Sequence, residues 1–461
     1  MFKSIADTFA NCFKIPELKS RILFTLLLLG VCRLLAWVPV PGLDGTLLQQ
    51  WFQENQKTAA GGVLGMYSLF TGGALNKCAV GALGIMPYIT ATIIIQLLTT
   101  VVGSLQKLAR EEGGRAQIVK YGRYLTVLLC IGHGTLMTLG WEHPQTVFPG
   151  FPEGEALVLI GNLWWYRIQT IIILTTGTML LMWLGEQITE RGIGNGISLV
   201  ITIGIVANLP MAAQGFFDMF FAPEGTTAKY NWFFMVFLFA LLVLVVAAVV
   251  AVTQAQRKIP VQYAQRAVGR KVFQGGSSFM PLRVNAAGVM PIIFAQAILM
   301  FPAMILVKAG DLFNLPPLAS AGHQLDRGHW TYYVLYTLMI LFFSYFWVAT
   351  QFNEIQIADD LKKHGGYIPG VRPGQATSDF LHRSMSRITL AGAIFLAVIA
   401  LVPQLMGQWF GINPNVAQFF GGTSLLITVG VLLDTMRQME THLLMRHYDG
   451  FLKKGRVKGR F

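Results

Sequence analysis

The sequence predicts an all-α polytopic membrane protein with ten transmembrane helices. Of its 461 residues, 54% are hydrophobic and only 12% are charged, whereas soluble domains carry roughly 25% charged residues. Apolar runs of roughly 20 residues, the length that crosses a bilayer core, recur between charged or Pro/Gly-rich breaks. The basic residues lie mostly on one side of these runs. These observations point to a chain embedded in a membrane.

The expected spans follow one another along the whole chain, separated by loops of very different charge. The fifth and the last are the weakest, because small and polar residues dilute them. In order, the spans are expected near residues 21–38, 79–101, 121–139, 165–184, 196–215, 232–252, 285–307, 330–350, 388–406 and 423–436.

Charge sidedness predicts the orientation. With an even number of spans both termini lie on one side, and roughly 28 basic residues fall on that side against roughly 6 on the other. The loop 255–281 carries five basic residues and no carboxylate, whereas 142–164 has carboxylates and no Lys or Arg. Both termini are therefore expected to be cytoplasmic. For the basic loops themselves, orientation with attraction to anionic lipid and docking of acidic or phosphate-rich partners remain alternative explanations.

The stretch 61–101 cannot be one continuous membrane helix, because glycines interrupt it. Its last part, 79–101, is long enough to span. Its first part, 63–70, would be only about 12 Å long as a helix, and Thr71-Gly72-Gly73 ends it. Non-helical backbone at membrane depth requires protein or a water-filled cavity around it. The chain is therefore expected to enclose something.

Motifs of catalysis are not found in the sequence. No phosphate-binding GxxxxGK[ST] motif, no HExxH and no Cys/His ligand spacing occurs, and GIGNG at 192–196 is best interpreted as a tight cytoplasmic turn. The four cysteines are interpreted as small hydrophobic side chains. No enzyme activity, cofactor or metal is expected, so any energy for transport must come from elsewhere.

Ionisable residues inside the expected spans are scarce, although ion-coupled transporters depend on them. Glu186 and Asp434 lie near span ends, and His133 is interpreted as a neutral side chain bonded to a neighbouring helix. Arg33 is the deepest charged side chain. It could bond a backbone carbonyl, extend its head group toward the membrane surface, or face an internal cavity.

Ordered motifs over nearly the whole chain resemble the SecY family, the channel subunit of the bacterial protein translocon. GGAL followed by ALGIMPYITATIIIQLL resembles the plug and second helix of that family. The other similar stretches are PVPGLD at 39–44, KYGRYLTV at 120–127, WLGEQITERGIGNGISL at 183–199, QRKIPVQYAQR at 256–266, NAAGVMPIIFA at 285–295, GGYIPGVRPG at 365–374 and GGTSLLITVGVLLD at 421–434.

The resemblance implies two pseudo-symmetric inverted halves of five spans with a short re-entrant plug helix between the first two. The N-terminal half would be 1–215, with the plug near 62–77. The C-terminal half would be 216–461, with cytoplasmic loops near 254–284 and 351–387 and a basic C-terminal tail. Inverted repeats are common among transporters.

The resemblance also assigns residues to the pore. Isoleucines four apart share a helix face, which alone favours ordinary packing. In the family such positions form an aliphatic ring at mid-membrane, which excludes ions by dewetting when it is empty. The matching ring residues are Ile85, Ile89, Ile197, Ile201, Ile293 and Ile427. The matching plug residues are Tyr67, Ser68, Leu69, Phe70, Thr71, Gly72, Gly73, Ala74, Leu75 and Asn76.

The resemblance implies lateral exit into lipid, with the second and third spans facing the seventh and eighth. It marks Pro87 and Ile93 in the second span and Pro291 and Gln296 in the seventh. Both prolines are expected to kink their helices. The long cytoplasmic loops match docking sites for a motor and the ribosome, which implicates Arg257, Lys258 and Arg372. A guanidinium suits rRNA phosphate and an acidic protein surface equally well.

The expected function is that of the central protein-conducting channel, which passes unfolded preproteins and releases apolar segments into lipid. The implied partners are the membrane subunits SecE and SecG, the ATPase SecA, the ribosome, signal peptides and membrane lipid. Because no transit segment precedes the first span, a bacterial inner membrane is expected. An ion-coupled small-molecule secondary transporter is the alternative, and it would need polar ligands where the resemblance places isoleucine.

Overall fold

The computed structural model describes residues 15–54, 63–111, 113–148, 151–152, 155–221, 230–263, 266–268, 271–273, 276–312, 315–325, 329–410, 416 and 423–454. Most of the expected basic tail, from residue 455 onward, and residues 421–422 of the GGTSLL stretch lie outside them. Contacts divide the chain into two compact units, Met1–Phe217 with Val431–Phe461, and Asp218–Gly430.

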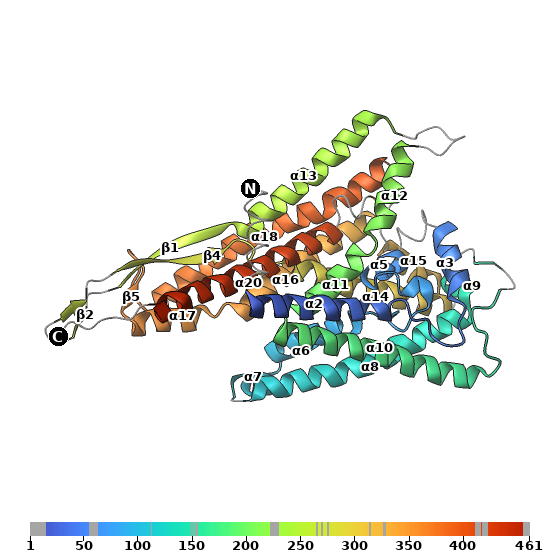
Figure 1. Ribbon diagram of the computed structural model, residues 1–461, viewed down its shortest axis with the longest axis horizontal. Helices are drawn as coiled ribbons and strands as arrows, with labels where there is room; N and C mark the ends of the chain where they lie inside the picture. The colour runs from blue at the N-terminus through green and yellow to red at the C-terminus, as the bar shows by residue number, and fades with distance from the viewer. Residues whose placement is uncertain are drawn as a thin grey trace. The chain divides into compact units, whose positions relative to one another are not determined.

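The first unit consists mainly of helices (Figure 1). It also includes the second part of the last helix, α20 (Thr423–Lys454). Its helices are α2 (Pro16–Leu35), α3 (Gly45–Glu54), α5 (Val63–Phe70), the short 3-10 helix η1 (Leu75–Lys77), α6 (Met86–Val101), α7 (Gly103–Arg110), α8 (Gly114–Glu142), α9 (Pro144–Val147), α10 (Leu163–Arg191), α11 (Gly196–Val206) and α12 (Leu209–Phe220).

Small residues explain why α8 and α10 lie side by side (Figure 1). One face of α8 buries a small residue at every fourth position from Gly122 to Thr138. A Cβ at Gly134 would lie 3.8 Å from the Cα of Ile171. Small residues at this spacing allow helix backbones to approach closely in a membrane, where packing replaces the hydrophobic effect as the driving force.

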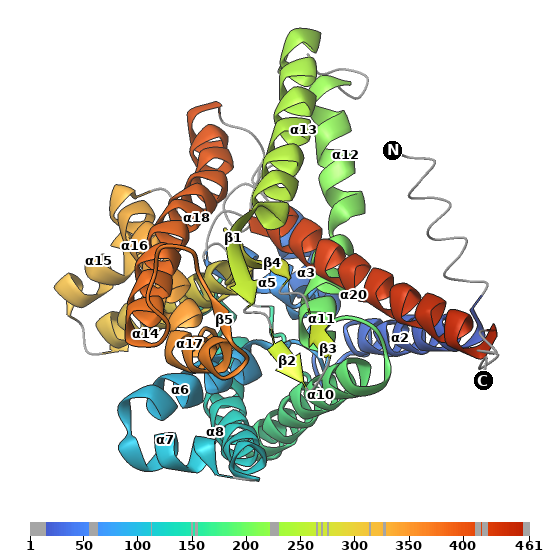
Figure 2. The same cartoon turned by 90° about the vertical axis from the view of Figure 1, so that its left-hand side faces the viewer.

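The second unit combines spanning helices with a small sheet. Figure 2 shows α14, α16 and α18 grouped together. Helix α16 contacts both α14 and α18. Its elements are α13 (Trp232–Gln254), β1 (Gln256–Tyr263), β2 (Arg266–Val268), β3 (Lys271–Phe273), β4 (Ser277–Arg283), α14 (Met290–Leu312), α15 (Pro316–Gln324), α16 (Trp330–Gln351), α17 (Glu354–Lys363), β5 (Gly366–Tyr367), α18 (Gln375–Phe410) and the start of α20.

The three-stranded sheet has the order β4-β1-β5, and β2 pairs separately with β3. None of these strands was expected from the sequence. β1 pairs antiparallel with β4 from Gln256↔Arg283 to Gln262↔Ser277, and with β5 through Gln262↔Tyr367 and Tyr263↔Gly366. Ile259 and Val261 are buried on β1 between exposed neighbours. This alternation within QRKIPVQY is the period of a half-buried strand and could have indicated it.

Several described helices are long and apolar enough to cross a bilayer. They are Gly114–Glu142, Leu163–Arg191, Gly196–Phe220, Trp232–Gln254, Trp330–Lys363 and Gln375–Val402. A further pair, Met86–Val101 and Gly103–Ala109, qualifies together but bends by 102° between its members. The remaining expected spans fall on α2, α14 and α20, which are helical over 20, 23 and 32 residues. The second span is shorter than expected, because 79–85 forms turns instead of helix.

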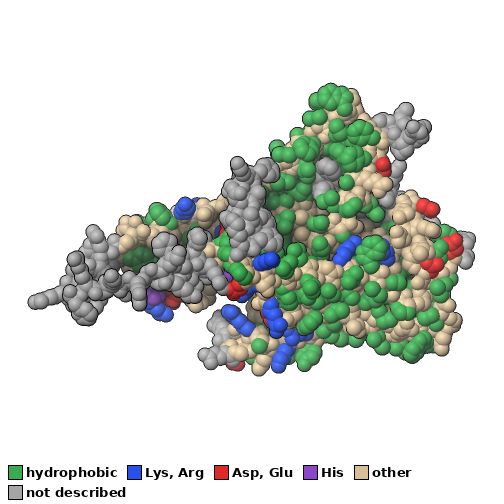
Figure 3. All heavy atoms as spheres, in the orientation of Figure 1, with side chains coloured by type: hydrophobic (Ala, Val, Ile, Leu, Met, Phe, Trp, Pro, Cys, Tyr) green, Lys and Arg blue, Asp and Glu red, His purple; other side chains and the backbone are tan. Residues whose placement is uncertain are grey.

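Exposed hydrophobic side chains cover much of the visible surface (Figure 3). In α13, the most apolar span, only 17% of an apolar stretch of 18 residues is buried by the rest of the protein. Phe233 and Leu244 of this helix are 70% and 64% exposed. A helix that is apolar all round and unburied by protein is typical of one that faces lipid.

Candidate functional site

The re-entrant segment begins with α5, whose bounds, Val63–Phe70, match the expected short helix. Gly72 and Gly73 follow with φ of +64° and +81°, the left-handed region that glycine adopts at little cost. The chain then forms η1 and reaches Cys78, a non-glycine residue at φ +47°. The expected helix end at Thr71-Gly72-Gly73 is therefore confirmed.

Hydrogen bonds hold the segment in one conformation. The hydroxyl of Ser68 donates to Asn76 Oδ1 at 2.6 Å, and the hydroxyl of Thr71 donates to the carbonyl of Ser68 at 3.1 Å. Tyr67, which is 5% exposed, donates to the carbonyl of Leu83 at 3.0 Å. Ala74 is fully buried. The non-helical backbone is thus enclosed by protein, as a membrane environment requires.

The PVPGLD stretch, residues 39–44, hydrogen bonds the chain that directly follows this segment. Val40 N donates to the carbonyl of Cys78 at 2.9 Å, and Pro39 forms an isolated bridge with Ala79. At its end, Asp44 accepts hydrogen bonds from the amide and hydroxyl of Thr46 at the start of α3. These bonds hold the pKa of the Asp44 carboxyl below its usual value.

Arg33 on α2 contacts the turn of the re-entrant segment. Its Nη1 donates to the carbonyl of Gly72 at 2.5 Å. The bond to a backbone carbonyl is one of the expected alternatives that the structure shows. Arg33 also lines a small pocket of about 30 Å³ together with Phe70, Thr71, Ile85 and Gly204. Such a volume is large enough for a water molecule.

Four of the six expected ring residues lie in the first unit. Ile85, Ile89 and Ile201 are 3%, 4% and 2% exposed, and Ile197 is half-buried. Ile85 precedes α6 instead of lying within it, but Ile89 N still donates to the Ile85 carbonyl at 3.1 Å. The helical spacing of this pair therefore persists into the turn.

The other two ring residues lie on α14 and α20 of the second unit, at matching heights. Gln296 Nε2 donates to Thr423 Oγ1 at 2.7 Å, and a Cβ at Gly430 would meet Val289. These contacts make the two helices antiparallel over this stretch. Ile293 lies between Val289, which directly precedes α14, and Gln296, and Ile427 lies between Thr423 and Gly430 on α20. Both side chains are almost completely buried.

The expected proline kinks are wrong. Pro87 is in the first turn of α6, and Pro291 is the second residue of α14. The first turn has no internal partner for its N–H groups, so a proline there removes no helix hydrogen bond. The proline inside α14 is Pro302. Ile93 and Gln296, the other two residues expected at a lateral gate, are 1% and 2% exposed.

The expected docking residues lie on the sheet of the second unit and in the turn that follows its last strand. Arg257 and Lys258 are exposed on β1 opposite Leu282 and Pro281 of β4. Arg372 is exposed in the turn that follows β5, where Gly370 and Gly374 have φ of +82° and +100°. Because β5 pairs with β1, two loops distant in sequence share one sheet above a core that includes Ile259, Ile368 and Leu381.

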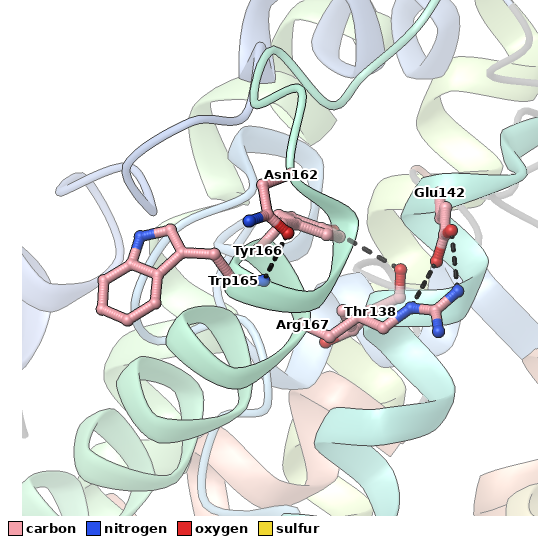
Figure 4. Close-up of polar contacts among 6 residues, drawn as sticks. All are labelled: Thr138, Glu142, Asn162, Trp165, Tyr166 and Arg167. Carbon is pink, nitrogen blue, oxygen red and sulfur yellow. Dashed lines mark hydrogen bonds and ion pairs between the residues drawn. The ribbon is translucent and has the colours of Figure 1, made fainter.

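An ion pair ties α8 to α10 at the ends nearest the 143–162 loop. Figure 4 shows Arg167 and Glu142 facing each other, with Nη2 to Oε1 at 2.8 Å and Nε to Oε2 at 3.0 Å. Tyr166 donates to the Thr138 carbonyl at 3.4 Å, and Asn162 caps α10 through the amide of Trp165. The loop between α8 and α10 also contacts the PVPGLD stretch, because Asp44 N donates a hydrogen bond to the Leu157 carbonyl at 2.9 Å.

Comparisons with known proteins give the family of the chain. The SecY family model matches residues 79–436. Protein translocase subunit SecY of Chlamydia trachomatis is 41% identical over 459 residues, covering 98% of this chain and 99% of that one. The same subunit of Thermotoga maritima is 41% identical over 458 residues, with the same coverage.

Solved structures share the fold. A structure described as a protein conducting channel has a TM-score of 0.58 at 20% identity, covering 97% of this chain and 99% of that one. Canine Sec61, in a ribosome-channel complex from the endoplasmic reticulum, has a TM-score of 0.54 at 19% identity with the same coverage.

The fold is that of a mainly helical membrane protein with a re-entrant segment between its first two spans, and it is shared with a solved protein-conducting channel. The chain belongs to the SecY family.

Proposed function

We propose that this chain is the central channel through which unfolded preproteins cross the membrane and from which transmembrane segments pass sideways into lipid. The observation that carries the proposal is the segment from Val63 to Lys77, whose non-helical backbone lies among buried side chains of the first unit. A membrane protein tolerates such backbone only where protein buries it or where it lines a water-filled cavity, and a closed segment within a channel meets this condition. One solved relative in fold is described as a SecY protein whose plug domain stabilises the closed state and maintains a membrane seal.

The isoleucine ring would form the constriction of this channel. Flexible apolar side chains can surround chains of many shapes without binding any of them tightly, and when empty they exclude ions. The ring would draw Ile85, Ile89, Ile197 and Ile201 from the first unit and Ile293 and Ile427 from the second. The two inverted halves, 1–215 and 216–461, remain part of this proposal. An ion-coupled transporter would instead need polar ligands at these positions.

Energy and substrates would arrive from the cytoplasm. We propose that the exposed Arg257, Lys258 and Arg372 dock SecA and the ribosome, and that SecE and SecG complete the membrane complex. Two structural neighbours come from ribosome complexes, canine Sec61 and yeast Ssh1, the latter bound to the 80S ribosome. The chain itself would catalyse no reaction. It would lie in a bacterial inner membrane with both termini in the cytoplasm.

The test is protease protection of a preprotein in proteoliposomes that contain this chain, SecE, SecG and SecA. ATP-dependent protection of a preprotein with an intact signal sequence is the expected result. If the chain is folded and correctly oriented but no preprotein becomes protected, the channel proposal is overturned. Uptake of small solutes along an ion gradient would then be the next assay.

A further inference from the structure

The bond between Arg33 and Gly72 joins the re-entrant segment to a spanning helix. Tyr67, Ser68 and Thr71 hydrogen bond within the segment or to the chain that directly follows it. Arg33, by contrast, belongs to the last turn of α2 and is 39 positions away from Gly72 in sequence. A charged donor on a half-buried side chain makes a stronger hydrogen bond than a neutral one does.

The backbone around this bond is shaped to admit the guanidinium. A Cβ at Gly72 would lie 2.7 Å from Arg33 Nη1 and 2.9 Å from the Cα of Gly204 on α11. A Cβ at Gly204 would lie 3.1 Å from the Phe70 carbonyl oxygen. Glycine at both positions therefore allows α2, the turn and α11 to meet at van der Waals distance. The positive φ of Gly72 also turns its carbonyl to a direction that most residues disfavour.

A small pocket lies beside this joint. Arg33, Phe70 and Thr71 line it, and its volume of about 30 Å³ has room for a water molecule. Lys77 is held separately, with its Nζ 3.1 Å from the centre of the Trp37 ring. One hydrogen bond to α2 and one cation–π contact thus tether the two ends of the turn.

We propose that Arg33 is a positioning residue that latches the plug turn to α2 and thereby sets how strong a signal sequence must be to open the channel. The selectivity part of this inference rests on the proposed function. Loss of this hydrogen bond lowers the free energy needed to displace the plug. A signal sequence can supply only its difference in binding free energy between the closed and open states. A weaker signal sequence then suffices to open the channel.

Cysteine alkylation tests the latch directly. The reporter is Ser68→Cys, a position that is 7% exposed, in full-length protein whose four native cysteines are replaced by alanine. The variants carry in addition Arg33→Gln, Arg33→Lys or Arg21→Gln. Arg21 lies on the same helix but pairs with Glu17 and serves as the matched control. The measurement is the rate of alkylation by a membrane-impermeant maleimide from outside proteoliposomes.

Arg33→Gln should accelerate alkylation about tenfold, since a hydrogen bond to a charged group is lost. The alkylation rate of Arg33→Lys should fall between those of this variant and the parent, because lysine keeps the positive charge but lacks the planar guanidinium. Arg21→Gln should react at the rate of the parent. Equal rates in all proteins would overturn the latch. If Arg33→Gln does not fold, Gly72→Ala crowds the same joint from the other side and should accelerate alkylation as well.

Export assays in the same vesicles test the selectivity. Arg33→Gln should raise protection of a preprotein with a defective signal sequence relative to one with an intact signal, and Arg21→Gln should not. An unchanged ratio despite faster alkylation would overturn the role in selectivity. If even the parent protects no intact preprotein, the proposed function fails, while the alkylation rates still decide whether the latch exists.

Discussion

Ile293 and Ile427 show at the scale of single residues how an apolar side chain can be read in two ways. They are 1% and 0% exposed, and helix packing alone would account for that burial. The contacts that align α14 with α20 add that the two side chains lie at the same height. Equal height is what a ring at one depth of the membrane requires.

Replacing Ile293 or Ile427 by asparagine should loosen the resting seal. A polar side chain in an apolar constriction attracts water and removes the barrier to ions. Ion leak through proteoliposomes should rise severalfold, and preproteins with defective signals should be exported. Leu432→Asn on α20 is the control, because Leu432 is 50% exposed. Leak equal to that of the control would contradict the ring assignment.

Sequence alone could rank Arg33 as unusual but could not identify its partner. Its position in an apolar span indicated a paired or extended charge. The partner is a backbone carbonyl, and any residue type supplies one, so no side-chain pattern marks it. What the sequence did contain was Gly72, whose left-handed φ and close contacts explain the glycine once the fold is known.

At the scale of elements, the turn between α10 and α11 is anchored on several sides. Ile193 N donates to Thr25 Oγ1 of α2 at 3.1 Å, and Gly194 N donates to Gln438 Oε1 of α20 at 2.8 Å. Ile193 and Leu18 form a small buried core with Met439 and Leu443. The motif GIGNG at 192–196 predicts a tight turn, but the anchors come from helices far away in sequence.

Gly194→Ala should destabilise the protein through this turn. Gly194 has φ of +88°, and a Cβ would lie 2.9 Å from Thr435 Oγ1. The left-handed conformation alone costs a non-glycine residue about 1–2 kcal/mol. Thermal unfolding of the purified protein should therefore begin at a lower temperature.

The control for this prediction is Gly132→Ala on α8, where a Cβ would meet nothing within 4 Å. Alanine in a helix interior is more favourable than glycine, so this variant should be at least as stable as the parent. If both variants unfold alike, the turn does not contribute to stability in the way described.

Elements were predictable where local chemistry decides them. The bounds of α5 followed from two glycines that end it. The kinks expected at Pro87 and Pro291 were wrong because a proline's effect depends on where its helix begins, and 79–85 forms turns stabilised by backbone bonds such as Val80 N to the Val38 carbonyl at 2.9 Å. The third strand of the sheet could not be predicted, because β5 has only two residues, Gly366 and Tyr367, and its pairing with β1 is tertiary.

At the scale of the whole molecule, charge sidedness predicts the orientation. Cysteine at Leu159, which is 70% exposed in the 143–162 loop, should react with an impermeant maleimide only from outside the cell. Cysteine at the exposed Tyr367 should react only in inverted vesicles, because its loop lies on the basic side. Labelling of both from one side would contradict the orientation.

Reversing the charge of Arg372 should impair export without affecting folding. Arg372 is exposed, so its replacement by glutamate leaves no buried group unpaired, but it removes a bidentate donor. SecA-driven, ATP-dependent protection should fall at least severalfold, while the unfolding temperature stays unchanged. Lys362→Glu on α17, also exposed, is the control. Normal export by the Arg372 variant would exclude a docking role.

The pairing of β1 with β5 has a mechanical consequence. Each long loop alone would be a compliant tether, but Gln262 and Tyr263 fasten the first to Gly366 and Tyr367 of the second, and the Tyr367 hydroxyl adds a bond to Gln262 Oε1 at 2.9 Å. The hairpin also continues directly from α13, and the core beneath it includes Leu381 of α18. A force applied to either loop by a bound partner is therefore shared by both loops and is transmitted to the membrane helices α13 and α18.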